Sequence, residues 1–223
     1  MTNLADALQL GELYSKPIQV FDLDGTLVDT LVDLTVSLNM ALYEHRLAPV
    51  SRDLVRASLH GGFEASVHAA LLASHAPVEL FDTLLESYRR CYRSTSGKRS
   101  RIYPGVSRVL GALRGRGARL AICSNKVEGE ARALLTILGL AGYFEAVVGA
   151  DTCGERKPSP VPLSRAVTLL GGTADESLFT GDSEIDIACA RAAAIDCAFF
   201  SGGYGDCGDA EVVQFDDWRR ITV

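Results

Sequence analysis

Short apolar segments alternate with helical patterns through the second half of the chain. The segments stop at polar or glycine residues, as buried strands do, and together with a first segment near the N-terminus they cover 18–21, 119–123, 146–148, 178–180 and 197–200. Apolar residues recur with helical spacing between these segments. One such pattern, 106–114, precedes the second segment, and three more follow later segments, at 127–138, 160–170 and 184–193. Strands that alternate with helices of this length predict an α/β fold with a doubly wound parallel sheet.

The segment after the first predicted strand has a different pattern. Leucines recur at steps of three and four residues from Leu31 to Leu42, and helical spacing continues with breaks through the rest of the segment. We therefore predict a helical domain at 31–97. It is inserted after the first strand of an α/β core domain made of 1–30 and 98–223.

Polar residues follow the predicted strands at the points where these strands end. Asp22 and Asp24 come directly after the first strand, and the two-residue period of a strand puts both side chains on one side. In open α/β sheets, ligands bind at the edge formed by the carboxyl ends of the strands. We expect the following side chains to gather at that edge: Asp22, Asp24, Ser124, Asn125, Lys157, Asp182 and Asp186.

This set of side chains has a chemical logic. Crowded carboxylates repel one another unless a cation lies among them, and hard oxygen ligands favour Mg²⁺. A carboxylate close to such a cation can attack phosphorus, while a lysine and hydrogen-bond donors stabilise the charge of phosphoryl transfer. Each motif alone has a plainer explanation, namely a turn at 22–26, a helix cap at Ser124 or Asp182, and a loop at Lys157. Their order, each after a predicted strand, favours the chemical interpretation.

Composition narrows the classes of partner. The 22 Lys and Arg residues against 28 Asp and Glu residues give a net charge of −6, which argues against nucleic acid or an anionic membrane as a partner but allows a small anionic ligand. The six cysteines form no C-x-x-C pair, so we interpret them as reduced thiols of a cytoplasmic protein. No apolar run has the length of a membrane span.

The four polar motifs resemble the signature motifs of the haloacid dehalogenase (HAD) superfamily. In this sequence they read Phe21-Asp-Leu-Asp-Gly-Thr-Leu-Val28, Cys123-Ser-Asn125, Lys157-Pro-Ser-Pro160 and Gly181-Asp-Ser-Glu-Ile-Asp186. The resemblance covers nearly the whole chain. It implies a Rossmann-like HAD core, and it implies that the helical insert is a cap of the C1 type, which closes over the active site.

The resemblance also implies catalytic and metal-binding roles. Asp22 would be the nucleophile, and its carboxylate would bind Mg²⁺. Asp24 would protonate the leaving oxygen and then activate the hydrolytic water, while its backbone carbonyl would bind the metal. Asp182 would complete the metal site.

Four further residues would serve the phosphoryl group. By the same resemblance, Ser124 and Asn125 would hold it, and Lys157 would neutralise it and orient Asp22. Asp186 would order Lys157 or the water molecules of the metal.

Branches of the superfamily can be separated by their residues. Dehalogenases lack an acid at the position of Asp24, and phosphonatases need a cap lysine, which 31–97 does not contain. The motifs are most similar to those of phosphoglycolate phosphatases, although Ala194 stands where that group usually has glycine. We therefore expect a Mg²⁺-dependent phosphatase that hydrolyses a small phosphate monoester, with 2-phosphoglycolate as the first candidate, through an aspartyl-phosphate intermediate. A sugar phosphomutase and a non-catalytic phosphate-binding regulatory protein remain alternatives, and the oligomeric state is not predicted.

The cap should select the substrate. The sequence His60-Gly61-Gly62-Phe63 is the candidate specificity loop, because paired glycines permit a tight turn close to a ligand. Arg56 lies one helical turn before His60 and is either a contact for a substrate carboxylate or part of a solvated helix face. Lys126 either lines the entrance to the site or caps the helix that follows it.

Overall fold

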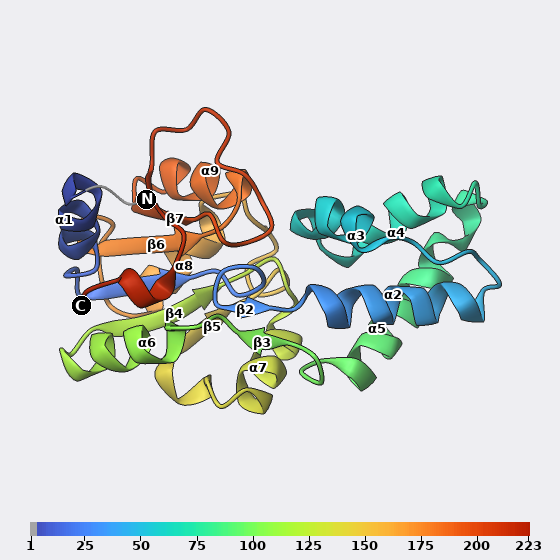
Figure 1. Cartoon of the computed structure of the whole chain (residues 1–223), viewed down its shortest axis with the longest axis horizontal. Helices are drawn as coiled ribbons and strands as arrows, with labels where there is room; N and C mark the ends of the chain where they lie inside the picture. Colours follow the sequence, from blue (N-terminus) through green and yellow to red (C-terminus); the bar gives the residue numbers. More distant parts are fainter. Residues whose placement is uncertain (1–3) are drawn as a thin grey trace. The chain divides into compact units, whose positions relative to one another are not determined.

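The computed structural model describes residues 4–223 and divides into two compact units (Figure 1). Unit 1 contains the chain up to Val28 and Ile102–Val223, and unit 2 is Asp29–Arg101. The chain passes between the units in two short strands, β2 (Val28–Asp29) and β3 (Arg101–Ile102), which pair with each other. No helix among the described residues is long and apolar enough to cross a membrane.

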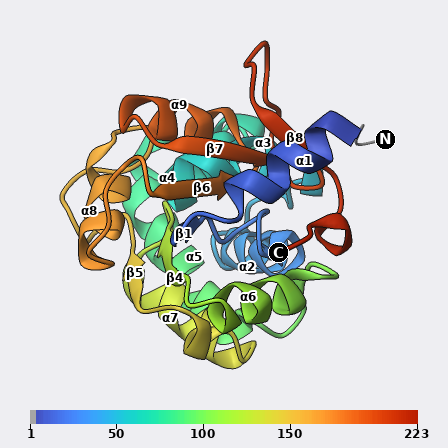
Figure 2. The same cartoon turned by 90° about the vertical axis from the view of Figure 1, so that its left-hand side faces the viewer.

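Unit 1 is built on a six-stranded sheet in the order β5-β4-β1-β6-β7-β8, with every neighbouring pair parallel (Figure 2). The strands are β1 (Ile18–Phe21), β4 (Arg119–Cys123), β5 (Ala146–Val148), β6 (Ser177–Gly181), β7 (Asp196–Phe200) and β8 (Val213–Phe215). Sequence order runs outward from β1 in both directions, so the sheet is doubly wound. The predicted fold class is confirmed.

Helices cover both faces of this sheet (Figures 1 and 2). One face packs against α1 (Leu4–Leu13), α6 (Val106–Gly115) and α7 (Glu128–Ile137), and the other against α8 (Val161–Leu169) and α9 (Glu184–Ala192). Alternate residues of β4 divide between the two cores, with Leu120 and Ile122 in the first and Ala121 and Cys123 in the second. This two-residue alternation is what a strand buried on both faces requires.

The C-terminal segment completes unit 1 in a way that the sequence pattern did not indicate. β8 extends the sheet, and the short 3₁₀ helix η4 (Trp218–Arg220) follows it. Trp218 is 1% exposed, and its indole Nε1 donates a hydrogen bond to the carbonyl oxygen of Thr26 at 3.0 Å. The end of the chain therefore supports the loop that follows β1. A further 3₁₀ turn, η3 (Ala141–Tyr143), precedes β5.

Unit 2 consists of four helices and two 3₁₀ turns. The helices are α2 (Leu31–Glu44), α3 (Arg52–Ser58), α4 (Gly62–Ala73) and α5 (Phe81–Thr95), and the turns are η1 (Leu59–Gly61) and η2 (Val78–Leu80). Ser51 caps α3 by accepting a hydrogen bond from the backbone of Leu54, as expected of a serine before a helix. The fully buried Asp33 joins α2 to the returning chain through hydrogen bonds from Arg99 and Ser100.

Element boundaries differ only slightly from those expected of the sequence. Unit 2 starts two residues before the predicted insert and ends four residues after it. Strands β4 and β5 coincide with their predicted ranges, and the core helices agree within one residue at each end. The sequence does not predict β2 and β3, because strands of two residues are too short to show a hydrophobic period. All six cysteines are free.

Candidate active site

Three strands at the centre of the sheet end in chemically active residues. β1 lies between β4 and β6 and pairs with both in parallel, so the residues that follow these strands meet at one edge. Asp22 follows β1, Ser124 follows β4, and Asp182 follows β6. This edge contains the point where the strand order reverses, and a crevice for ligands is common there in open α/β sheets.

Lys157 joins two of the carboxylates. Its Nζ lies 2.7 Å from Oδ1 of Asp22 and 2.6 Å from Oδ1 of Asp186, and its side chain is 4% exposed. Burial lowers the pKa of Lys157, but the attraction of Asp186 and Asp22 outweighs this and holds the pKa well above its usual value. Lys157 is therefore a permanent cation at the centre of the cluster.

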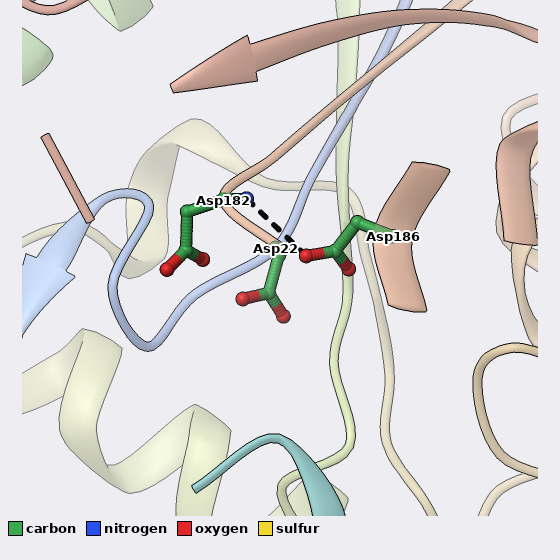
Figure 3. Close-up of side chains that lie close together, drawn as sticks. All are labelled: Asp22, Asp182 and Asp186. Carbon is green, nitrogen blue, oxygen red and sulfur yellow. Dashed lines mark hydrogen bonds between the residues drawn. The ribbon is translucent and has the colours of Figure 1, made fainter. Parts of the chain in front are cut away.

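Both carboxylate oxygens of Asp186 accept hydrogen bonds from neighbouring residues. Its Oδ1 accepts from Lys157, and its Oδ2 accepts from the Ser183 hydroxyl at 2.6 Å and from the backbone N–H groups of Asp182 and Ser183 at 3.2 Å. Ser183 and Asp186 thereby form the capping box that starts α9. Figure 3 shows Asp22 between Asp182 and Asp186, with the three carboxylates directed toward a common region.

Asp182 is held by neutral donors. The Thr26 hydroxyl donates to its Oδ1 at 2.8 Å, and the backbone N–H of Tyr204 donates to its Oδ2 at 2.7 Å. A side chain at Gly25 or Gly203 would collide with this carboxylate, since a Cβ at either position would lie within 2.4 Å of Oδ2. Within the part of the chain that the structure describes, Asp182 has no cationic partner, and burial together with repulsion from Asp22 and Asp186 raises its pKa well above the usual value.

The site fits a divalent cation. One oxygen from each of Asp22, Asp182 and Asp186 lies within 4.8 Å of the others. Burial, opposed by Lys157 and reinforced by Asp186 and Asp24, raises the pKa of Asp22 to about 6. When all four carboxylates of the site are ionised, the ammonium groups of Lys157 and Lys126 leave an excess of two negative charges among the described side chains, which a divalent cation would offset. Among the described residues, Asp186 accepts four hydrogen bonds, one of them from Lys157, whereas Asp182 accepts two from neutral donors and Asp22 accepts one, so Asp22 and Asp182 are better suited to bind the cation.

Asn125 and Ser124 are placed differently from each other. The carboxamide of Asn125 pairs with both backbone groups of Lys157, donating to its carbonyl at 3.1 Å and accepting from its N–H at 2.9 Å. The side chain of Asn125 therefore fixes the loop that presents Lys157. Ser124 is 5% exposed, and its hydroxyl lies 3.4 Å from the backbone nitrogen of Lys126.

Asp24 has a partner of its own. Its Oδ2 accepts from Nζ of Lys126 at 2.8 Å, and the two side chains are 14% and 3% exposed. The sequence predicts an entrance residue or a helix cap at Lys126, and in the structure its ammonium group lies on Asp24.

The three candidate residues of the insert lie at one turn of unit 2. Arg56 is an exposed residue in the last turn of α3, and Gly61 ends η1 just before α4. Gly62 has a φ of 76°, in the left-handed region that favours glycine, so the paired glycines do form the tight turn between the helices. The side chain of His60 lies outside the described part of the structure.

Three residues of the site were not identified from the sequence: Thr26, Ser183 and Tyr204. Thr26 and Ser183 lie inside the first and the last of the four motifs, but a hydroxyl in a sequence does not indicate which carboxylate it contacts. Tyr204 contributes a backbone N–H, which any residue could supply. The only signal was the glycines on either side of it, because Gly203 and Gly205 leave room for Asp182 and Ser183.

Comparison with known proteins agrees with this geometry. A family model of haloacid dehalogenase-like hydrolases matches residues 19–200. A phosphoglycolate phosphatase of Rhodospirillum rubrum is 41% identical over 83% of this chain and 79% of its own length, and one of Agrobacterium fabrum is 37% identical over 93% and 91%. A crystal structure described as that of "a predicted phosphoglycolate phosphatase" from Haemophilus somnus 129PT superposes with a TM-score of 0.85 at 29% identity, covering 92% of this chain and 96% of that one. With its motifs gathered at one sheet edge and matched over most of its length, the chain belongs to the haloacid dehalogenase-like hydrolase family.

Proposed function

We propose that this protein is a Mg²⁺-dependent phosphatase that hydrolyses a small phosphate monoester through an aspartyl-phosphate intermediate on Asp22. The observation that carries the proposal is the cluster of Asp22, Lys157 and Asp182 at the carboxyl ends of β1 and β6. It combines a carboxylate nucleophile, a fixed ammonium and a carboxylate without a cationic partner among the described residues.

The first step transfers the phosphoryl group to the protein. The carboxylate of Asp22 attacks phosphorus, and the bond from phosphorus to the leaving oxygen breaks. Asp24 gives its proton to that oxygen, so the product leaves as an alcohol. Lys157 donates to Asp22 and stabilises the negative charge of the phosphoryl oxygens, and Ser124 donates its hydroxyl to one of them.

The second step returns Asp22 to its starting state. Asp24, now a carboxylate, removes a proton from water as the water attacks phosphorus. The bond between phosphorus and the Asp22 oxygen breaks, and inorganic phosphate leaves. Asn125 holds the backbone of Lys157 and is assigned, with Ser124, to the binding of the phosphoryl group.

The metal is assigned to Asp22, Asp182 and the backbone carbonyl of Asp24. When bound, Mg²⁺ supplies positive charge that offsets the charges of the phosphoryl oxygens. Oxygen donors alone and a deficit of two positive charges favour Mg²⁺ over metals that prefer nitrogen or sulfur ligands.

The substrate is a small phosphorylated metabolite, with 2-phosphoglycolate as the first candidate. Support comes from the relatives named phosphoglycolate phosphatases, two of which align over four fifths or more of this chain. We assign unit 2 the role of the C1 cap, in which the turn at His60 and Gly61, together with Arg56, would select the leaving group.

The test is phosphate release from a panel of monoesters with Mg²⁺, repeated in EDTA. The panel contains 2-phosphoglycolate, hexose phosphates, nucleotides and pyrophosphate, and Asp22→Asn is the inactive control. We expect one preferred compound, loss of activity in EDTA and recovery with Mg²⁺. Isomerised sugar phosphate with little free phosphate would identify a phosphomutase instead. Binding without turnover by a folded protein would identify a regulatory protein.

A further inference from the structure

The ion pair between Asp24 and Lys126 is separate from the cluster around Lys157. Nζ of Lys126 lies 2.8 Å from Oδ2 of Asp24, whereas Lys157 contacts Asp22 and Asp186. The side chain of Lys126 is 3% exposed. Burying an ammonium group costs folding free energy that a single good ion pair only partly offsets. A buried ammonium that lies on Asp24, the residue proposed to exchange the proton, therefore calls for a functional explanation.

The two oxygens of Asp24 have different surroundings. Oδ2 accepts from Lys126, but Oδ1 is buried and has no hydrogen-bond partner among the described residues. Buried acceptors are nearly always paired, and an exception is a candidate position for a ligand or a reacting group. Oδ1 is thus the oxygen of Asp24 that is available to a substrate.

The backbone of Lys126 is hydrogen-bonded at both its nitrogen and its carbonyl, and its N–H donates to the Ser124 hydroxyl at 3.4 Å. Its carbonyl accepts from the N–H of Ala150 at 3.0 Å, which ties the end of β4 to the end of β5. Gly149 permits this approach, because a Cβ there would lie 2.7 Å from the same carbonyl and 2.3 Å from the backbone nitrogen of Glu128. The ammonium group therefore extends from a rigid base.

We propose that Lys126 is a positioning residue for Asp24: it binds Oδ2 and thereby presents Oδ1 to the leaving oxygen of the substrate. The proposal rests on the proposed function, in which Asp24 exchanges the proton. Because Lys126 donates to Oδ2, the proton that Asp24 gives to the leaving oxygen sits on Oδ1, and the same Oδ1 takes the proton of the attacking water in the second step. Lys126 then acts through Asp24 and not by contact with the substrate.

The first experiment is a double-mutant cycle on an alkyl phosphate, with 2-phosphoglycolate as the probe. We expect Lys126→Met to lower kcat about 10- to 100-fold, within the range that general acid–base catalysis contributes, with KM nearly unchanged. Lys126→Arg should recover most of this loss, because it keeps the charge. In an Asp24→Asn background, Lys126→Met should lower kcat less than about two-fold further. Lys98→Met, at an exposed lysine of unit 2, is the matched control.

The second measurement separates orientation from substrate contact. p-Nitrophenyl phosphate has a leaving group that needs no proton, so the first-turnover burst of p-nitrophenolate should be the same in Lys126→Met and wild type. The later steady-state rate, which needs Asp24 to activate water, should fall. A loss that persists in the Asp24→Asn background, or a KM that rises only for anionic leaving groups, would overturn the proposal and make Lys126 a substrate contact.

A crystal structure of Lys126→Met decides the case if Asp24→Asn is too slow for the cycle. A rotated Asp24 side chain is expected, and an unmoved one contradicts the proposal. Failure of the underlying function has a different signature, since wild-type protein would then release no phosphate from any monoester. Activity of Lys126→Met equal to that of wild type would refute only the positioning role.

Discussion

Asp33 in unit 2 and Asp182 in unit 1 are both buried aspartates with opposite surroundings. Asp33 accepts from two backbone N–H groups and from the Ser100 hydroxyl, all at 2.7–3.1 Å, and among the described residues it belongs to no cluster of three or more acidic side chains. Asp182 accepts two hydrogen bonds but lies within 4.8 Å of oxygens from Asp22 and Asp186. Burial of a carboxylate therefore does not indicate chemistry, whereas crowding of carboxylates does.

The largest expected effect comes from a substitution in the cluster of carboxylates. Asp22→Asn should lower kcat about 10⁴-fold or more, because the nucleophile is lost while the other groups remain. The variant should keep its fold, as measured by circular dichroism and thermal unfolding. Phosphate release at the wild-type rate from a verified Asp22→Asn sample would exclude Asp22 as the nucleophile.

A second substitution tests the structural role of the isolated carboxylate of Asp33 in unit 2. Asp33→Ala should lower the free energy of unfolding by about 3 kcal/mol, because it leaves buried N–H groups of Arg99 and Ser100 without an acceptor. Urea unfolding measures this change, and Asp209→Ala, at an exposed aspartate, is the control with an expected change below about 0.5 kcal/mol. A loss no larger than that of the control would mean that Asp33 does not hold the two ends of unit 2.

The pH dependence of stability sharpens the comparison further. The pKa of Asp22 is about 6 in the folded protein and about 4 in an unfolded chain, so ionisation of Asp22 destabilises the folded state as pH rises from about 4 through 6. In EDTA, the stability of Asp22→Asn relative to wild type should therefore increase over this window, by an amount on the order of 2 kcal/mol. Urea unfolding at pH 4, 5, 6 and 7 gives the difference. A difference in stability that stays constant with pH would show that folding does not raise the pKa of Asp22.

The smallest effect concerns a position away from the carboxylates. Ala194 has a φ of 55° just after α9, in a conformation that costs an L-residue strain and that glycine adopts freely. Ala194→Gly should raise the free energy of unfolding by about 0.5–1 kcal/mol, measured in urea, and should leave kcat unchanged. A decrease in stability would indicate that the alanine methyl packs well enough to offset the strain.

The limits of sequence-based prediction follow from these same contacts. The positions of Asp22, Ser124 and Asp182 could be predicted, because an apolar strand that ends in a polar residue is a local pattern. The pairing of Asn125 with Lys157, 32 residues away, depends on how two loops meet, and no local pattern records it. β8 has three residues and pairs only with β7, so its strand character comes from the sheet and not from its own sequence.

The contact that Lys126 makes could not be predicted from the sequence either. The sequence shows that a positively charged residue follows Ser124 and Asn125. Which of several acids it would contact depended on the direction of a long side chain, and the sequence allowed two other roles for it.

The pairing of β2 with β3 has a consequence for how such proteins diversify. Because the chain leaves and re-enters unit 1 through adjacent strands, with Tyr103 N–H bonded to the carbonyl of Leu27, the two junctions lie side by side. Another helical segment could therefore replace the one between the two junctions without displacing a strand of the six-stranded sheet. If unit 2 has the role proposed for it, such a replacement would change the substrate that is selected and leave the residues that follow β1, β4 and β6 in place.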